Sequence, residues 1–448
     1  MDQVKRLNRI NSLKGRGTLR SIETIDQLKQ YLDDPDKEVQ EMACRAIVEE
    51  VLGSDHKELR LQALQRLRTL LQPQDKGPSA GQIDLHTHDS LSDDAYLTPS
   101  SLVLMAYEEG LTTLGIVSHN RHYNDDEAEQ AAILLNIGFF KGTEISVCVP
   151  LKNGHGETIH INQLYVEEPP PERMHELFKS YVLQYQQDLR LLGYDLQQAL
   201  EEPEQALILL REKSYDRQTA TVWKRFREQY GSRLPLAWEE LEAARRGERT
   251  NAFTIAVALW RKFGFQLQNG WEQIEGDFST RVVFRDVAEV YMKLIQPVRN
   301  SNEAKSAIQL PNLKTVASRA AQLQRKLILP HPNECSPEAL EQTLEDLALV
   351  EADGCQYSGL FVGVEYYSHK LKEPLKGQVK KLVERLNRDH PVYRRHPLLL
   401  LPGSDYHGCF SHKYPLGLRD NYPNDIESYN RKVLEVLHRP PVIYNREP

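Results

Sequence analysis

The stretch Asp84-Leu85-His86-Thr87-His88 places two histidines two positions apart at the end of a short apolar run that begins at Ile83. A short apolar run of this kind is typical of a β-strand, in which residues i and i+2 point to the same side. His86 and His88 can therefore reach a single metal ion. The pattern alone does not decide this, because two ordinary core or surface histidines would have the same spacing.

Six further short apolar runs also end directly in a histidine, aspartate or glutamate. Helical patterns separate most of them, and this alternation is typical of βαβ units and a mostly parallel sheet. The carboxyl ends of barrel strands meet at one mouth, where these side chains are expected to gather. The sequence therefore predicts an α/β barrel. The seven strand candidates are residues 83–85, 113–117, 139–142, 159–164, 327–329, 360–364 and 398–401.

Residues 166–324 interrupt this alternation between the fourth and fifth strand candidates. Their patterns are mainly helical, and a segment of this length is too long to be a loop in a compact domain. We expect an inserted helical subdomain, over or beside the mouth, within a barrel domain that spans residues 82–448.

Residues 1–75 are expected to form a separate helical region. The pattern K-E-V-x-x-x-A-x-x-x-I from Lys37 recurs as K-E-L-x-x-x-A-x-x-x-L from Lys57, and the polar linker QPQDKGPSAG follows at residues 72–81. The repeat resembles a helix pair of HEAT-type solenoids, which usually stack about three pairs or more. Two interpretations stay open: a helical N-terminal extension packed on the barrel, or a module that binds a protein partner.

Further motifs follow the histidine pair in a fixed order. They are S-D at residues 92–93, T-P at 98–99, I-V-S-H-N at 116–120, G-T-E-I-S at 142–146, a histidine at 160, P-H-P at 330–332, V-E at 364–365 and G-S-D-Y-H-G at 403–408. This ordered set resembles that of the PHP (polymerase and histidinol phosphatase) family from about residue 82 to 444, the insertion excepted. The resemblance implies a distorted TIM-like (β/α)7 PHP barrel and a metal-dependent phosphoesterase.

By this resemblance, nine side chains would hold two to three divalent ions. The implied sets are His86, His88 and Asp405 with Glu144; Asp93, His119 and His407; and Glu144, His160 and His331. Imidazole with carboxylate suits zinc, manganese or iron. Two positions depart from the family: Ser118 stands where it has an aspartate, and Asp94 where it usually has a glycine. Asp89 or Asp94 could therefore take the place of Asp93.

The chemistry implied by such a centre is hydrolysis. Neighbouring divalent ions lower the pKa of a shared water toward about 7 and hold phosphoryl oxygens. A phosphate ester, either a monoester or a nucleotide-like molecule, is therefore the expected substrate, attacked by a metal-bridging hydroxide with Glu144 and Asp405 as catalytic carboxylates. The acid for the leaving group stays open among Glu365, His122 and His369, although a supporting role for Glu365 and an ordinary surface position for the two histidines explain these residues better.

The insertion carries a basic and aromatic stretch at residues 211–233, with seven basic and three acidic side chains. Its aromatic residues would suit a nucleotide or short single strand, but a solvated helix whose aromatic side chains face a core explains them as well. Arg249 is the candidate lid residue for the substrate phosphate. Two alternative functions remain: a 5′-to-3′ exonuclease on short single strands, and a catalytically weak PHP module that recruits a protein through its N-terminal helices.

The composition limits the remaining classes. No apolar run approaches the roughly 20 residues that cross a bilayer, and the basic N-terminus lacks the apolar core of a secretory signal, so we expect a cytoplasmic protein without membrane contact. Five scattered cysteines without a C-x-x-C pair predict reduced thiols. The net charge of -8 disfavours binding to long duplex nucleic acid.

Overall fold

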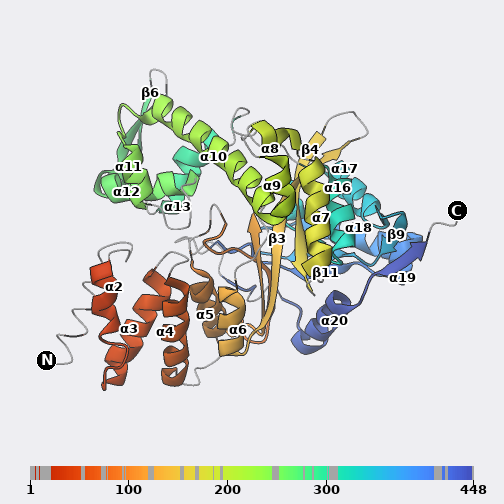
Figure 1. Cartoon of the computed structure of the whole chain (residues 1–448), viewed down its shortest axis with the longest axis horizontal. Coiled ribbons are helices and arrows are strands. Elements are labelled where there is room, and N and C mark those ends of the chain that lie inside the picture. The colour runs from red at the N-terminus through yellow and green to blue at the C-terminus, as the bar shows by residue number, and fades with distance from the viewer. Residues whose placement is uncertain are drawn as a thin grey trace.

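Seven strands form one curled sheet in the computed structural model of this chain (Figure 1). In spatial order they are β1 (Ile83–Thr87), β2 (Thr113–His119), β3 (Gly138–Pro150), β4 (Gly156–Tyr165), β7 (Lys326–Leu329), β10 (Phe361–Tyr367) and β11 (Leu399–Pro402). A strand thus lies at each of the seven positions expected from the sequence. The structure describes residues 6, 10, 22–51, 56–71, 77, 79–92, 95, 97–119, 126–151, 156–166, 171–184, 186–191, 195–244, 252–275, 278–284, 287–299, 301, 311–407, 416–418 and 422–445.

The two edges of this sheet meet. All neighbouring strands are parallel except β4, which runs antiparallel to both β3 and β7. At the edges, Asp405 N donates to His86 O and His88 N donates to Tyr406 O, each at 2.8 Å. The segment after β11 therefore pairs with β1, and the mixed α/β sheet is curled in a way that agrees with a TIM-like fold.

The interior of the curled sheet is filled by an apolar layer. Phe140, Leu164 and Ile328 project into it from three different strands, and Val433 and Leu437 reach it from α20 (Ile426–His438). Five more helices accompany the strands: α5 (Pro99–Glu109), α6 (Glu127–Leu135), α16 (Leu313–Gln322), α17 (Pro337–Asp346) and α18 (Leu375–Asp389). The polar side chains that end the strands lie beyond this packed layer.

The T-P motif at residues 98–99 has a structural role at the start of α5. Thr98 caps the helix by accepting a hydrogen bond from Ser101 N, and Pro99 occupies the first helical turn, where its missing N–H costs nothing. Gly110 ends the helix with φ 82°, a conformation that favours glycine. The local sequence therefore defines both ends of the helix that connects β1 to β2.

The N-terminal helices α2 (Ile22–Lys29), α3 (Lys37–Glu50) and α4 (Lys57–Leu70) lie in a row with α5 and α6 (Figure 1). Asp36 caps α3 by accepting from the backbone N–H groups of Glu38 and Val39. One apolar cluster joins Ile47 and Leu64 of these helices to the buried faces of α5 and α6. The structure thus has these helices packed on the barrel.

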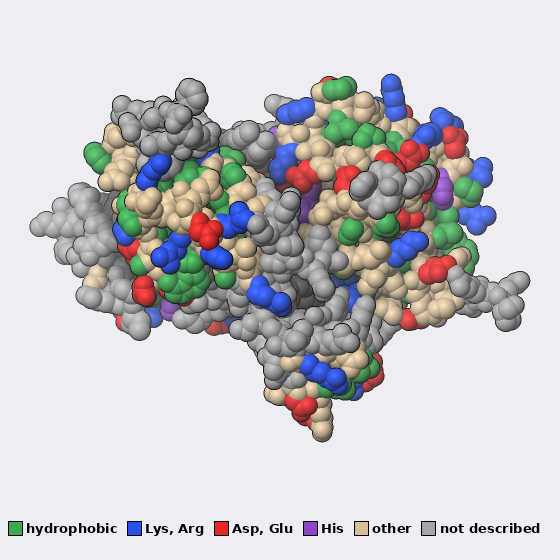
Figure 2. All heavy atoms as spheres, turned by 90° about the horizontal axis from the view of Figure 1, so that it is seen from above, with side chains coloured by type: hydrophobic (Ala, Val, Ile, Leu, Met, Phe, Trp, Pro, Cys, Tyr) green, Lys and Arg blue, Asp and Glu red, His purple; other side chains and the backbone are tan. Residues whose placement is uncertain are grey.

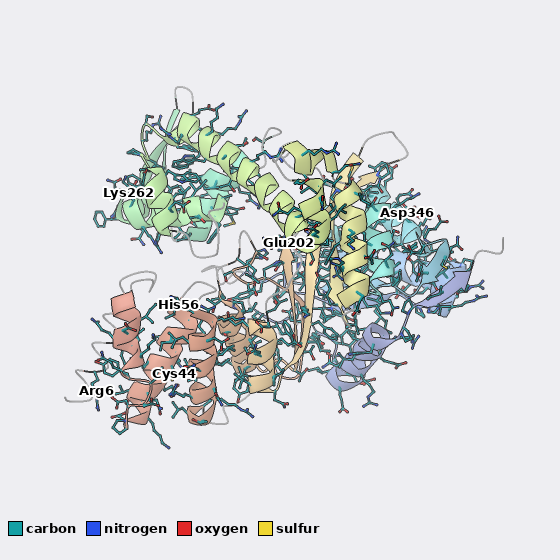
Figure 3. All side chains as sticks on the ribbon, in the orientation of Figure 1. Arg6, Cys44, His56, Glu202, Lys262 and Asp346 are labelled. Atoms are coloured by element: carbon teal, nitrogen blue, oxygen red, sulfur yellow. The ribbon has the colours of Figure 1, made fainter. Side chains whose placement is uncertain are left out.

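The insertion leaves the barrel after β4, and its far part forms a lobe at a distance from the barrel (Figure 1). Its long helix α10 (Pro203–Tyr230) has 28 residues and is therefore about 42 Å long. Figure 3 shows Glu202 at the barrel end of this helix and Lys262 in the far lobe. The other elements are α7 (Pro171–Gln184), α8 (Gln186–Leu191), α9 (Leu196–Glu201), α11 (Trp238–Ala244), α12 (Ala252–Gln268), β5 (Trp271–Glu275), β6 (Phe278–Val282), α13 (Val287–Val290), the π-helical turn η2 (Tyr291–Ile295) and α14 (Gln296–Arg299).

Three aromatic side chains of α10 belong to the core of this lobe. Trp223, Phe226 and Tyr230 are buried together with apolar residues of α12 and η2. The basic Lys224 and Arg227 on the same helix are exposed. Of the two explanations for the stretch, the structure favours a solvated helix whose aromatic side chains face a core.

Three elements complete the architecture. A small antiparallel sheet consists of β8 (Val350–Ala352), β9 (Cys355–Ser358) and β12 (Val442–Asn445), and the short helices η3 (Pro332–Glu334) and α19 (Pro391–Arg395) follow β7 and α18. Cys44, Cys148, Cys335 and Cys355 are free thiols. Within the described ranges, no helix combines the length and apolar character needed to cross a membrane.

Candidate metal centre

The ends of the barrel strands bring eight of the nine candidate ligands together. Most of these ligands lie near or just beyond the end of a strand. Glu144 lies within β3, opposite Asn162 of β4. The eight residues are His86, His88, His119, Glu144, His160, His331, Asp405 and His407. The ninth candidate, Asp93, lies outside the described residues, as do Asp94, His122 and Arg249.

Glu144 is the centre of this cluster. Its carboxylate is fully buried, and five imidazole nitrogens, carried by four strands or by the residues just after them, lie within 3.2 Å of its two oxygens. Oε2 lies 3.1–3.2 Å from His88 Nε2, His86 Nε2 and His119 Nδ1, and Oε1 lies 2.8 Å from His331 Nε2 and 2.9 Å from His160 Nδ1. One carboxylate therefore faces two different groups of imidazoles with its two oxygens.

Asp405 is the second carboxylate of the cluster. Its Oδ1 lies 3.3 Å from His88 Nε2 and 3.4 Å from His86 Nε2 and from His407 Nδ1. Its Oδ2 contacts the ammonium of Lys370, a residue that the sequence did not single out. The two oxygens of Asp405 thus face an imidazole side and an ammonium side.

Three groups of described side chains have ligand atoms within 4.8 Å of one another. They are His88, His119 and His407; His86, Glu144, His331 and Asp405; and His160, His331 and Glu334. This grouping divides the residues differently from the sets implied by the family resemblance, since His88 lies with His119 and His407. It also adds Glu334, whose only sequence signal is its position three residues after His331.

Several neighbours fix the orientation of the imidazoles. Glu365 Oε2 lies 2.8 Å from His86 Nδ1, Ser92 Oγ lies 3.1 Å from His88 Nδ1, and Glu334 Oε2 lies 3.3 Å from His331 Nδ1. Such partners set the tautomer and ring direction of a metal-binding histidine. Of the two roles expected for Glu365, acid for the leaving group or support for a ligand, this position favours support for His86.

Two further residues expected near the site, His369 and Asp89, make contacts outside the three ligand groups. His369 Nε2 lies 2.9 Å from Gly417 O, which ties its ring to a backbone carbonyl. Asp89 is buried and accepts a hydrogen bond from Leu91 N through Oδ1. Asp89 belongs to none of the three groups of described ligand atoms.

The backbone at two candidate ligands is strained. His331 has φ 25° and Asp405 has φ 52°, in the left-handed region that side chains with a Cβ seldom adopt. A Cβ at Gly403 would lie 2.6 Å from Glu365 Oε2 and 2.9 Å from His86 Cβ, so the G-S-D motif needs a glycine for close approach. Strain of this kind is typical of functional sites.

The two carboxylates are held in their charged form. Burial alone would raise the pKa of Glu144, but the imidazoles of His119 and His160 hold it well below its ordinary value. Burial would likewise raise the pKa of Asp405, and His86 is the largest of the charges that hold it well below. Both groups are therefore stabilised as anions by the positive charge that surrounds them.

The histidines divide into two kinds. Burial alone would lower the pKa of His86, but Asp405 and Glu144 hold it well above its ordinary value. Burial and the charge of His407 lower the pKa of His88 to about 4. One imidazole beside the carboxylates thus favours a positive charge and its neighbour stays neutral, as a metal-binding histidine must be.

The residues present fit a group of divalent metal ions. Asp405 Oδ1 is buried and accepts no hydrogen bond from a described residue, although three imidazole nitrogens lie within 3.4 Å. This oxygen faces imidazoles, whereas Oδ2 contacts Lys370, and the donor set of imidazoles and carboxylates suits zinc, manganese or iron. The side chains of His119, His407 and His160 are 13%, 18% and 27% exposed, so the cluster opens to solvent beside them.

Figure 2 shows a face of the molecule from above relative to Figure 1. Histidine surface is visible near the middle of this face, beside acidic and basic side chains.

Comparison with known proteins gives partial matches. No family model matches the chain. A 5′-3′ exoribonuclease from Haemophilus influenzae is 37% identical over 89 residues, which are 20% of this chain and 30% of that enzyme. The chain thus spans less than a third of the length of this relative, and the match concerns a segment of the fold.

Two solved structures are also similar. A proposed metal-dependent phosphoesterase from Bifidobacterium adolescentis has 18% sequence identity and a TM-score of 0.46, and the match covers 82% of this chain and 98% of that one. An amidohydrolase from Chromobacterium violaceum, solved with bound sulfate and no metal, has 16% identity and a TM-score of 0.46, with 78% and 96% covered.

Proposed function

We propose that this chain is a metal-dependent hydrolase of phosphate esters of the PHP type, acting on a phosphomonoester or a nucleotide-like substrate. The observation that carries the proposal is the convergence of imidazoles on the buried carboxylates of Glu144 and Asp405. Structural histidines rarely gather in such a number around buried carboxylates, whereas multinuclear hydrolytic centres need this arrangement.

The three groups of ligand atoms would together hold two to three metal ions, with at most one ion in each group. Bound there, zinc, manganese or iron would provide hydroxide at neutral pH and neutralise the phosphoryl oxygens. Glu144 would link the groups, because its two oxygens face different imidazoles. Glu365 would hold the ring of His86 in place.

The exposed side chains mark where a substrate would approach. His119, His160 and His407 are partly exposed, whereas His86, His88 and Glu144 are buried. A phosphate ester would therefore enter beside the first three, and the buried residues would stay shielded from water. Arg249 remains our proposal for a lid residue that contacts the substrate phosphate.

Turnover and metal content test this proposal together. Purified protein, reconstituted with manganese or zinc, should hold two to three equivalents of metal by plasma mass spectrometry. It should also hydrolyse p-nitrophenyl phosphate or a nucleoside monophosphate. Fewer than one equivalent after reconstitution would contradict the multinuclear centre.

A second candidate is a 5′-to-3′ exonuclease on short single strands. The segment shared with the Haemophilus influenzae exoribonuclease supports it. The burial of Trp223, Phe226 and Tyr230 weighs against base stacking on α10. Stepwise release of mononucleotides from a labelled trinucleotide, faster than hydrolysis of any monoester, would favour this candidate.

A third candidate is a catalytically weak module whose N-terminal helices recruit a protein. Its support is the resemblance of residues 37–70 to a HEAT-type helix pair. Absence of turnover on all these substrates, with full metal content, would favour it over both enzymatic candidates.

A further inference from the structure

Lys370 lies at the outer side of the ligand cluster. Its ammonium contacts Asp405 Oδ2, while Oδ1 of the same carboxylate faces the imidazoles of His86 and His88. The carboxylate therefore separates the imidazole side of the site from the ammonium. A cation in this position is next to the ligand atoms without being one of them.

The segment after β10 holds Lys370 in this place. Lys370 N donates to Ser368 Oγ at 3.3 Å, and the ring of His369 is tied to Gly417 O. The next residue, Leu371, is buried in an apolar cluster. The ammonium is thus presented by an anchored loop rather than by a free surface side chain.

The exposure of Lys370 suits contact with a substrate. Its side chain is 23% exposed, compared with 4% for Asp405, so part of Lys370 reaches solvent whereas the carboxylate is buried. An ion bound to Asp405 Oδ1 would share the charge of this carboxylate and weaken its attraction to Lys370. The positive charge of the ammonium would then act on an anion that approaches the ions.

We propose that Lys370 binds the phosphoryl group of the substrate and makes the site prefer phosphate monoesters over phosphate diesters. The inference rests on the proposed phosphoesterase function and deepens it. A monoester carries about two negative charges at neutral pH and a diester carries one. A fixed ammonium beside the ions attracts the more highly charged group more strongly.

The test compares Lys370→Met with Lys372→Met. Lys372 lies on the same segment, is exposed, and its replacement removes the same charge without touching the cluster. With p-nitrophenyl phosphate, kcat/KM of Lys370→Met should fall about ten- to a hundredfold, as for a lost charge-assisted hydrogen bond to phosphate. With bis(p-nitrophenyl) phosphate the loss of kcat/KM should be several-fold smaller. Lys372→Met should match the wild type on both esters. Lys370→Arg should retain more of the preference for the monoester than Lys370→Met does.

Metal content separates this role from a structural one. Lys370→Met should keep the metal content of the wild type by plasma mass spectrometry. Loss of metal in this variant would overturn the proposal, because Lys370 would then only hold Asp405 in place. Equal losses on the two esters would overturn it as well, and so would no loss on either.

Binding of inorganic phosphate keeps the test independent of turnover. Calorimetry on the metal-loaded proteins should give a Kd for phosphate about tenfold or more weaker for Lys370→Met than for the wild type. If the wild type hydrolyses no ester, the proposed function fails, and the phosphate Kd alone decides on Lys370. An unchanged Kd in Lys370→Met would then overturn phosphate binding by this residue.

Discussion

The guanidinium of Arg60 forms a buried, two-point ion pair with the carboxylate of Glu127. Nε lies 2.7 Å from Oε1 and Nη2 lies 2.5 Å from Oε2, and the two side chains are only 2% and 0% exposed. Glu127 Oε1 also accepts from the backbone N–H and hydroxyl of Ser100. Three helices, α4, α5 and α6, therefore meet at one carboxylate.

Replacing one partner of this pair should destabilise the protein. Arg60→Met leaves a buried carboxylate without its cation, and the loss of one partner of a buried pair costs about 3–5 kcal/mol. Urea unfolding should show this decrease in the free energy of unfolding. Arg66→Met is the matched control, because Arg66 lies on the same helix and pairs with the exposed Asp33, where about 1 kcal/mol or less is expected. Equal effects of the two variants would show that the buried pair does not hold α4 to the barrel.

Glu144→Ala and Asp405→Ala should each abolish turnover of phosphate esters. Each variant removes a carboxylate that faces three or more imidazoles, so metal content should fall as well. The circular dichroism spectrum should stay close to that of the wild type, because the ligands lie outside the packed apolar layer of the barrel. A variant with half of the wild-type activity would exclude the altered residue as a metal ligand.

Glu365→Ala should weaken metal binding without removing a ligand. The carboxylate holds His86 through Nδ1, and loss of such a partner typically lowers metal affinity or activity about 10- to 100-fold. Competition with a chelator would measure the metal affinity. Glu384→Ala, at an exposed position of α18, should bind metal like the wild type. Identical affinities for Glu365→Ala and the wild type would contradict this role.

Lys326 predicts an unusual dependence of stability on pH. Burial and the charge of Arg439 lower the pKa of Lys326 from 10.5 to about 8, although its ammonium donates to Gly359 O and Arg439 O. Between these two pKa values the unfolded chain binds more protons than the folded chain, so this residue makes the free energy of unfolding rise with pH. The contribution is present above about pH 10.5 and is lost as the pH falls through about 8.

Comparison with Lys326→Met isolates this contribution. The difference in the free energy of unfolding, wild type minus variant, should grow by up to about 3 kcal/mol between pH 7.5 and pH 10.5. Urea unfolding at several pH values gives this difference, and tyrosines that titrate in the same range cancel because both proteins contain them. A difference that does not change with pH would show that Lys326 keeps an ordinary pKa.

The strands were predictable where each one is a short apolar run that ends in a polar motif. The expected ranges 139–142 and 159–164 were too short, because β3 and β4 continue as a hairpin from the pair Lys141 and Tyr165 to the pair Pro150 and Gly156. From Ser146 onward, buried side chains alternate with half-buried or exposed ones, which lacks the continuous apolar signal of a barrel strand. The strands of the small sheet, three or four residues each, are too short to have a recognisable period.

The candidate site was predictable to the extent that its residues belong to local motifs. Glu334 and Lys370 escaped notice because their roles depend on the path of the chain after β7 and β10, which no local pattern records. Lys370 meets Asp405 only because the two segments that follow neighbouring strands lie side by side. Whether the aromatic residues of α10 stack on a nucleotide or pack into a core likewise depends on the packing of the lobe, which the local sequence does not show.

The pairing of β1 with the segment after β11 has a consequence for biosynthesis. His86 and His88 leave the ribosome early, whereas Asp405 and His407, which face them, are made much later, after the entire insertion. The backbone hydrogen bonds from Asp405 to His86 and from His88 to Tyr406 can form only after this last segment has been made. A nascent chain therefore carries its first imidazoles for most of translation without the carboxylate that completes their surroundings, and metal binding at the proposed centre would be one of the last events of folding.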